Sequence, residues 1–303
     1  MKRVACVFAI AAMTSGISAA EAQEMPAAYA QVLTTLGKTG DFKDNVLKVN
    51  IPRNDVKVVV DGIATPTPFG FGGWVAFTTG TGGDVMMGDL VLTEDEVNGV
   101  MSAVLNGGLD VTALHNHFFY ESPRIFYMHV HGHGAAADLA AKIKPALDLL
   151  GKTPARPAAP AAPGRSLEGK LDTEALARTI GTPGEQNGAV YKITIGRPDI
   201  ALKEMGATIN ARMGLNTWAA FYGSDADAVV AGDVAMLASE VTPVLKALRT
   251  NGLDVVAIHH HMTGTAPEIY FLHYWGKGPA AKLATGVKAE VDVPGKGRGS
   301  SRK

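Results

Sequence analysis

The chain has 303 residues, of which 47% are hydrophobic and 19% charged, and its formal net charge is −1. This length and composition supply a core and suggest about two domains. The charge balance excludes a nucleic-acid partner, because binding phosphates requires an excess of Lys and Arg. The single cysteine, Cys6, excludes a disulfide scaffold and a thiolate metal site.

The N-terminal segment has the pattern of a secretory signal peptide. Lys2 and Arg3 precede an apolar run at 4–17, and Ala20-Glu21-Ala22 resembles an A-x-A cleavage site. The run is shorter than the roughly 20 apolar residues that a membrane-spanning helix needs. We therefore expect residues 1–22 to be removed and the mature protein to be periplasmic or secreted, with no membrane anchor.

The rest of the chain is a tandem repeat. The ten residues 108–117 read GLDVTALHNH and align without a gap with 252–261, GLDVVAIHHH, 144 positions later. A Pro/Ala-rich segment separates the two copies and favours an extended polyproline II conformation. We expect a first repeat domain, a linker, a second repeat domain and a basic flexible tail at 23–151, 152–165, 166–292 and 293–303.

Within the first copy, strands are predicted at 46–51, 56–61, 74–79 and 85–92. Thr93 and Glu96 form a capping box for a helix that starts near Val97. Residues 111–118 and 125–130 flank a Tyr-Glu-Ser-Pro-Arg turn and predict a β-hairpin, and residues 135–150 predict a second helix. The order β-β-β-β-α-β-β-α indicates an α+β fold: a tandem duplication of an antiparallel-sheet α/β sandwich with ferredoxin-like elements, its helices on one face of each sheet.

All nine histidines fall in two windows, 115–133 and 259–273. His115 and His117 alternate on a predicted strand, so both side chains lie on one face, and the hairpin brings His129 beside them. Three imidazoles with an open position resemble the ligand set of a catalytic zinc site. The second copy offers the same three positions, which are His259, His261 and His273. Hairpin register stays open, because a slip of one residue would move His129 to the opposite face.

Further polar and aromatic side chains accompany the histidines. Glu121, in the hairpin turn, is a candidate fourth ligand or general base, and its counterpart is Thr265. Asp89 and Asp233 are candidates for a hydrogen bond that orients a ligand histidine, with a role in a turn as the alternative.

The candidates for binding a small organic or sugar ligand are Trp74, Tyr120, Arg124 and Trp218. Packing in the core is the alternative role for the two tryptophans. A salt bridge within the turn is the alternative role for the arginine.

The segment from Ala113 to His129 reads ALHNHFFYESPRIFYMH and is followed by Gly132-x-Gly134. Together with GDLVL at 88–92, it resembles the signature of the LppY/LpqO family of exported bacterial proteins, and the resemblance extends over 29–290. That resemblance implies export but no activity, since the family has no established one. Its name-giving members are lipoproteins; this sequence lacks the lipobox cysteine, so membrane anchoring is not implied.

These patterns favour an exported soluble protein that binds a divalent transition metal, Zn²⁺ or Cu²⁺, through His115, His117 and His129. The second-copy trio would be a second or a degenerate site. An enzyme of this design, a metal-dependent hydrolase or lyase, would activate water at the open position with Glu121 as base. The alternative is a metal-free periplasmic binding module that holds a small organic or sugar ligand in the cleft between the repeats. The sequence leaves the substrate and the oligomeric state open.

Overall fold

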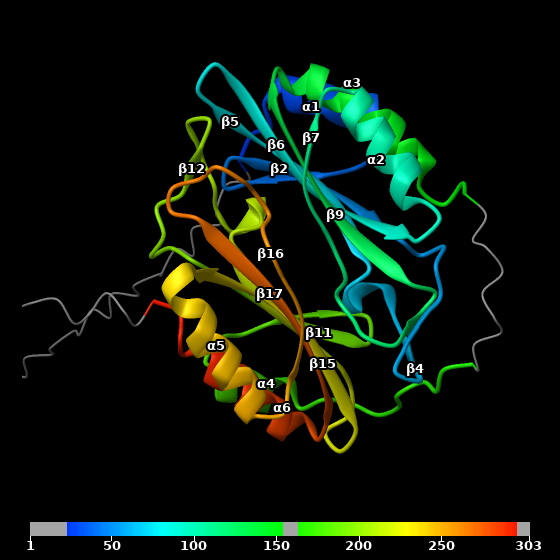
Figure 1. Ribbon diagram of the computed structural model, residues 1–303, viewed down its shortest axis with the longest axis vertical. Helices are drawn as coiled ribbons and strands as arrows, with labels where there is room; N and C mark the ends of the chain where they lie inside the picture. Colours follow the sequence, from blue (N-terminus) through cyan, green and yellow to red (C-terminus); the bar gives the residue numbers. More distant parts are fainter. Residues whose placement is uncertain (1–22, 154–162, 296–303) are drawn as a thin grey trace, which may run out of the picture.

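The computed structural model describes residues 23–153 and 163–295, which form two halves of similar architecture (Figure 1). The predicted signal peptide at 1–22 lies outside the described residues. So do residues 154–162 of the predicted linker and residues 296–303 of the predicted tail.

The first half is built on a six-stranded antiparallel sheet with the order β1-β2-β5-β6-β9-β7. Its strands are β1 (Asp41–Lys43), β2 (Val46–Pro52), β5 (Gly72–Gly80), β6 (Gly83–Thr93), β7 (Asp110–His115) and β9 (Ile125–Gly134). One face is covered by α1 (Ala27–Leu36), α2 (Val97–Asn106) and α3 (Ala136–Leu149). A small sheet and a short 3₁₀ turn complete the half: β3 (Val58–Val60), β4 (Ile63–Thr65), β8 (Glu121–Ser122) and η1 (Thr67–Phe69).

The second half repeats this plan with the strand order β10-β11-β14-β15-β17-β16. Its strands are β10 (Glu185–Asn187), β11 (Val190–Gly196), β14 (Asn216–Gly223), β15 (Ala228–Leu237), β16 (Asp254–His259) and β17 (Ile269–Gly278). Its helices are α4 (Thr173–Ile180), α5 (Ala238–Thr250) and α6 (Ala280–Val291). A two-stranded ribbon and a 3₁₀ turn are added: β12 (Lys203–Glu204), β13 (Ala207–Thr208) and η2 (Ala211–Met213).

The predicted fold class is confirmed: an α+β protein whose two similar halves each carry an antiparallel sheet with helices on one face. The predicted strand at 56–61 is shorter, and β3 pairs with β4 and β8 rather than with the main sheet. Helix α1, which was not expected, buries Tyr29, Val32 and Leu36, and Gly37 ends it in the left-handed conformation.

The halves pack with their helices outside and their sheets facing each other (Figure 1). In each half, one apolar cluster lies between the sheet and its own helices. Two more join the halves, one around Phe69, Tyr127 and Trp275 and the other around Met87 and Phe271. Because both faces of the central strands are covered, β6 is mostly buried along its length, a pattern that differs from simple alternation. None of the helices formed by the described residues combines the length and the apolarity needed to cross a membrane.

A buried ion network fixes the start of α2 to the sheet. The Arg53 guanidinium, 3% exposed, donates to both carboxylate oxygens of Glu96 at 2.7 and 3.0 Å and to the Val91 carbonyl at 2.7 Å. Glu96 also accepts from the backbone N–H of Thr93 at 2.8 Å and of Gly151 at 2.6 Å. Half of the predicted capping box is therefore present, while the buried Thr93 hydroxyl has no hydrogen-bond partner among the described residues.

The second half reproduces this network 144 positions later. Arg197 donates to Glu240 at 2.9 and 3.0 Å and to the Ala235 carbonyl at 2.6 Å, and Glu240 accepts from Leu237 and Gly295. Because equivalent residues make the same hydrogen bonds in both halves, the two copies of the repeat fold in the same way at this point.

Replacing Glu96 with Ala is expected to destabilise the protein by about 3 kcal/mol, because the buried Arg53 loses its buried carboxylate partner and keeps only Asp55, whose side chain is 48% exposed. Glu240→Ala is expected to cost a similar amount. Urea unfolding followed by circular dichroism measures both. Lys144→Met, which removes the exposed pair with Asp148, is the control and is expected to change stability by less than about 0.5 kcal/mol. Equal effects of the three variants would contradict a structural role for the network.

One buried carboxyl belongs to the second half alone. Glu290 on α6 is fully buried, and the Tyr274 hydroxyl is the polar group that acts on its carboxyl as a hydrogen-bond donor. Burial raises the pKa of Glu290 well above its ordinary value, and the charge of Asp233 acts in the same direction. The corresponding residue of the first half is Ala146.

Glu290 is expected to make the protein less stable as the pH rises. Its folded-state pKa is raised, so the folded protein keeps a proton that the unfolded chain has lost above about pH 4.5, which costs up to about 1.4 kcal/mol per pH unit. Glu290→Gln removes this slope, and the stability of the variant should exceed that of the wild type by a margin that grows from pH 5 to pH 7.5. Urea unfolding in the presence of a chelator tests this, with the exposed Glu174→Gln as control. A constant difference across this pH range would refute the assignment.

Candidate metal centre

Six histidines from the two halves meet where the sheets face each other. His115 and His259 end the edge strands β7 and β16, and their rings lie 3.7 Å apart between centroids. His117 and His261 follow two residues later, and His129 and His273 lie on the neighbouring strands β9 and β17. All six are buried, with at most 8% of each residue exposed. The duplication therefore gathers both predicted trios in one place.

The register of the hairpin, open in the sequence, places the first-copy histidines on one face. His129 lies opposite Ala113, and His115 lies opposite Tyr127, after an irregularity between Val111 and Ala113. The His115 ring is 5.1 Å from that of His129 and 5.2 Å from that of His117. No histidine of this trio is turned away from the others.

The nearest contacts cross between the copies. The His117 ring lies 3.6 Å from that of His273, and the His129 ring lies 4.1 Å from that of His261. The Nε2 atoms of His115 and His273 are 3.2 Å apart. Each H-x-H pair is thus completed by the hairpin histidine of the other half.

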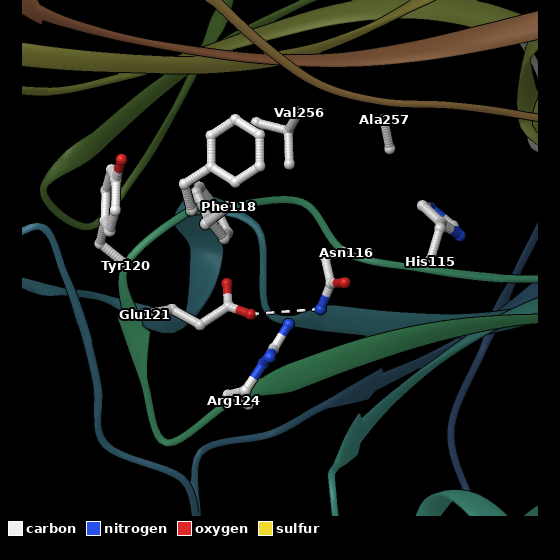
Figure 2. A pocket seen from close by; sticks show the side chains of 9 residues that line it. His115, Asn116, Phe118, Tyr120, Glu121, Arg124, Val256 and Ala257 are labelled. Atoms are coloured by element: carbon white, nitrogen blue, oxygen red, sulfur yellow. Dashed lines mark hydrogen bonds between the residues drawn. The ribbon is translucent and has the colours of Figure 1, made fainter.

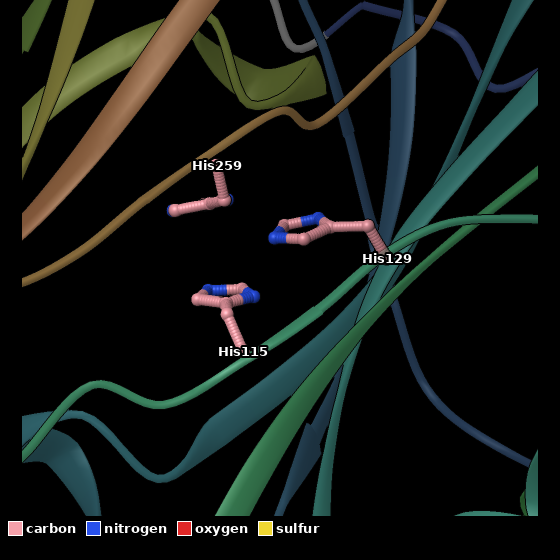
Figure 3. A group of neighbouring side chains, drawn as sticks. All are labelled: His115, His129 and His259. Carbon is pink, nitrogen blue, oxygen red and sulfur yellow. The ribbon is translucent and has the colours of Figure 1, made fainter.

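Three groups among the described residues bring three candidate ligand atoms within 4.8 Å of one another. They are His115–His129–His259 (Figure 3), His115–His117–His273 and Asp233–His259–His261. Two of these groups combine both halves. The trio of His115, His117 and His129 expected from the sequence does not form such a group by itself.

Hydrogen bonds to the backbone orient most of these rings. Three rings pair through Nδ1 with a backbone carbonyl: His273 with Gly232 (3.1 Å), His261 with Gly214 (3.2 Å) and His259 with His260 (3.2 Å); His129 hydrogen-bonds to the backbone of Gly88. A carbonyl can only accept, so this network assigns the proton to Nδ1 and leaves a lone pair on Nε2, which in His273 lies 3.2 Å from Nε2 of His115. Second-sphere bonds of this kind fix the tautomer of metal-binding histidines.

Several ring nitrogens in the cluster have no partner. Among the described residues, Nε2 of His129 and His259, Nδ1 of His115 and both nitrogens of His117 are buried without a hydrogen bond. A buried polar atom left unpaired costs about 1–3 kcal/mol. The concentration of such atoms at one point is what a site for a ligand requires.

Burial also keeps the rings uncharged. It lowers the pKa of every one of the six, to about 4 for His259 and about 3 for His261, and the neighbouring histidines lower most of these pKa values further. At neutral pH these imidazoles are therefore neutral, the form that binds metal ions.

Two aspartates border the rings at equivalent positions. Asp233 on β15 is 2% exposed and lies opposite His273, with one oxygen 3.4 Å from Nε2 of His261 and the other 3.9 Å from Nε2 of His259. Asp89 lies opposite His129 in the same way. Burial raises the pKa of both carboxyls to about 7.

Glu121 lies in a cavity of about 410 Å³ that the His115 side chain also lines (Figure 2). Its Oε1 accepts from Asn116 Nδ2 at 3.3 Å and from the Ile125 N–H at 3.2 Å, whereas its buried Oε2 has no partner among the described residues. Burial raises the pKa of this carboxyl to about 7. Glu121 belongs to none of the three candidate ligand groups.

The two other candidates from this turn lie at the same cavity. Tyr120 is 84% exposed, and the Arg124 guanidinium lies 5.7 Å from the centroid of the Phe126 ring.

Trp74 and Trp218 line a second cavity, of about 700 Å³, between the halves. It reaches the cluster through His117, His261 and His273, so Glu121 and the tryptophans lie in different cavities.

Two lysines of this second cavity were missed by sequence reasoning. Lys48 lies 4.5 Å from the Trp74 ring and Lys192 lies 4.2 Å from the Trp218 ring, and burial lowers the pKa of both to about 8. The repeat contained a signal for them, because they are also 144 positions apart.

Comparisons with known proteins place the chain in a family without giving it an activity. No curated protein matches it. Among solved structures, a trimeric bacterial microcompartment shell protein, PduB, is 13% identical with a TM-score of 0.20; the match covers 84% of this chain and 90% of that chain. EtuB from Clostridium kluyveri is 8% identical with a TM-score of 0.20, over 84% of this chain and 89% of that chain. Likeness at this level carries no argument about function.

A family model described as Domain of Unknown Function (DUF1259) matches residues 30–149 and again residues 174–293. Together these two matches cover most of the sequence and correspond to the two structural halves. The chain therefore belongs to the DUF1259 family and contains two tandem copies of its domain.

Proposed function

We propose that this protein binds divalent transition metal ions, Zn²⁺ or Cu²⁺, in the histidine cluster between its halves. The observation that carries the proposal is the set of buried imidazole nitrogens that lack a partner and lie together at one point. We further propose that it acts in the periplasm or as a secreted protein and is related to the LppY/LpqO family. Those two points rest on the N-terminal sequence and on the segment from Ala113 to His129.

Two crossed sites account best for the arrangement. The first comprises His115 and His117 of one half with His273 of the other. Its counterpart would comprise His259 and His261 with His129, whose ring lies 4.1 Å from that of His261, while the three ligand atoms there that lie within 4.8 Å of one another are those of Asp233, His259 and His261. Asp233 adds a carboxylate to the counterpart.

One pair of candidate ligand atoms has the spacing expected around a tetrahedral ion. Zn–N bonds of about 2.0–2.1 Å place two nitrogens of a tetrahedral site roughly 3.3 Å apart. The 3.2 Å between Nε2 of His115 and of His273 matches that value. Three protein ligands then leave a fourth position for water or substrate.

The chemistry of the ligands supports Zn²⁺ and Cu²⁺. Neutral imidazole suits both ions, and a carboxylate completes sites of this kind. The one cysteine, Cys6, lies in the predicted signal peptide, so the mature protein would offer no thiolate.

Removing the hairpin histidine of one half is expected to weaken the metal site built on the H-x-H pair of the other half. His273→Ala should weaken Zn²⁺ binding at the site of His115 and His117 by more than about 100-fold, because loss even of an outer partner costs 10–100-fold. His117→Ala should have the same effect. Calorimetric titration and elemental analysis of untagged protein measure this, and melting in a chelator checks that each variant folds.

The control for these variants is His133→Ala. This ring is exposed and pairs with the Thr81 carbonyl outside the cluster, so metal binding should be unchanged. If His273→Ala left the affinity intact while His117→Ala abolished binding, the site would be confined to one copy. If the wild type showed no heat with either ion, the metal proposal would fail and a metal-free binding module would remain.

Glu121 supports a second candidate function, a metal-dependent hydrolase or lyase. Its carboxyl has a free buried oxygen, lies in a cavity that reaches His115, and has a pKa raised to about 7 by burial. An ion in the cluster would lower the pKa of a bound water, and Glu121 would accept the proton.

For this candidate, Glu121→Gln should lower the rate of Zn²⁺-dependent hydrolysis of an activated ester by at least about 100-fold, the usual contribution of general acid–base catalysis. Zn²⁺ affinity should stay the same, because Glu121 belongs to none of the three candidate ligand groups. Initial rates with the metal-loaded protein test this, with the exposed Glu174→Gln as control. An unchanged rate in Glu121→Gln would exclude the residue as the base.

A further inference from the structure

The larger cavity between the halves has a strongly polar wall. None of the described residues that line it is Val, Leu, Ile, Met or Phe. Amide and hydroxyl side chains from both halves are present instead: Asn50, Asn54, Thr67, Asn187, Thr194 and Asn216. Such groups both donate and accept hydrogen bonds, which suits a ligand rich in hydroxyls. Its volume of about 700 Å³ lies within the range of small-molecule sites.

Charged groups of both signs line this cavity: the carboxyls of Asp89, Glu185 and Asp233, and the cations of Arg212 and of two lysines that lie on the tryptophans. Lys48 and Lys192 are half-buried, and neither makes an ion pair within 4 Å in the described part of the chain. Each ammonium instead lies on the ring of a tryptophan, Trp74 or Trp218. A desolvated lysine without a close carboxylate partner favours an anionic ligand.

The tryptophans connect the lysines to the histidine cluster. The Trp218 ring lies 6.2 Å from that of His117 and 6.1 Å from that of His273. On the other side, Trp74 packs against Gly214, where an added Cβ would lie 3.3 Å from the indole and 3.2 Å from Nδ1 of His261. The flat indole surfaces of the two tryptophans therefore lie between the lysine ammonium groups and the histidine rings.

We propose that this cavity binds a hydroxylated carboxylate of the sugar-acid class. Its carboxylate pairs with Lys48 and Lys192, its ring lies along the indoles, and its hydroxyls bond to the asparagine and threonine side chains. The inference rests on the proposed metal centre, because three of the candidate ligand histidines line the cavity and a bound ion would face the sugar acid.

The test is calorimetric titration of the full chain, first with Zn²⁺ and then, in the Zn²⁺-loaded protein, with glucuronate. Glucose is the matched probe without the carboxylate, and benzoate is a carboxylate without hydroxyls. Glucuronate is expected to bind, with the two other probes at least about 10-fold weaker, since charge-assisted hydrogen bonds of about 1.5–3 kcal/mol correspond to 10-fold or more.

Variants of the lysines separate charge from packing. Lys48→Met and Lys192→Met should each weaken glucuronate binding by about 10-fold or more and leave Zn²⁺ affinity unchanged. Lys48→Arg and Lys192→Arg should keep most of the affinity for glucuronate, because the charge remains. The exposed Lys144→Met is the control and should change neither titration.

The outcomes distinguish this inference from the proposed function. Absence of Zn²⁺ binding would overturn the metal centre. Normal Zn²⁺ binding without heat from glucuronate would overturn the sugar-acid site alone, as would equal affinities for glucuronate and glucose or intact binding in both Lys→Met variants.

Discussion

The structure depends on the burial of six uncharged imidazoles at the contact between two sheets. Neutral rings can be buried at modest cost only when their nitrogens find partners, and the backbone carbonyls satisfy only some of them. The two apolar clusters around Trp275 and around Phe271 flank the rings, and two cavities reach them. The unpaired nitrogens are thus held by packed surroundings and stay accessible to a ligand, which is the arrangement that a metal site requires.

Duplication explains why two of the three candidate ligand groups draw on both halves. The H-x-H pair of each copy contacts the hairpin histidine of the other, as His117 does with His273. The repeated networks of Arg53 and Arg197 hold the start of one helix in each half against its own sheet. The function we propose belongs to the contact between the halves.

The sequence was sufficient for the repeat, the fold class and the identity of the histidines, because strand alternation and a constant spacing of 144 positions are local properties. The crossing of His129 to His261 was not predictable, since it depends on how two sheets pack, which no periodicity encodes. Lys48 and Lys192 were overlooked because a lysine on a strand usually reaches solvent. Their half-burial follows from packing against the other half.

The departures from symmetry indicate where chemistry would occur. Histidines at equivalent positions, such as His115 and His259, would supply metal ligands from both halves. The position equivalent to Glu121 is occupied by Thr265, which has no carboxyl. Besides the equivalent Asp89 and Asp233, a carboxyl therefore lies in the cavity that His115 lines, and the lysines and tryptophans lie in the other cavity. A ligand held by the lysines would reach a bound ion from that second cavity, whereas Glu121 would act from the first. The group that binds the ligand and the group that accepts a proton would then lie in different cavities, an asymmetry that two identical copies could not provide.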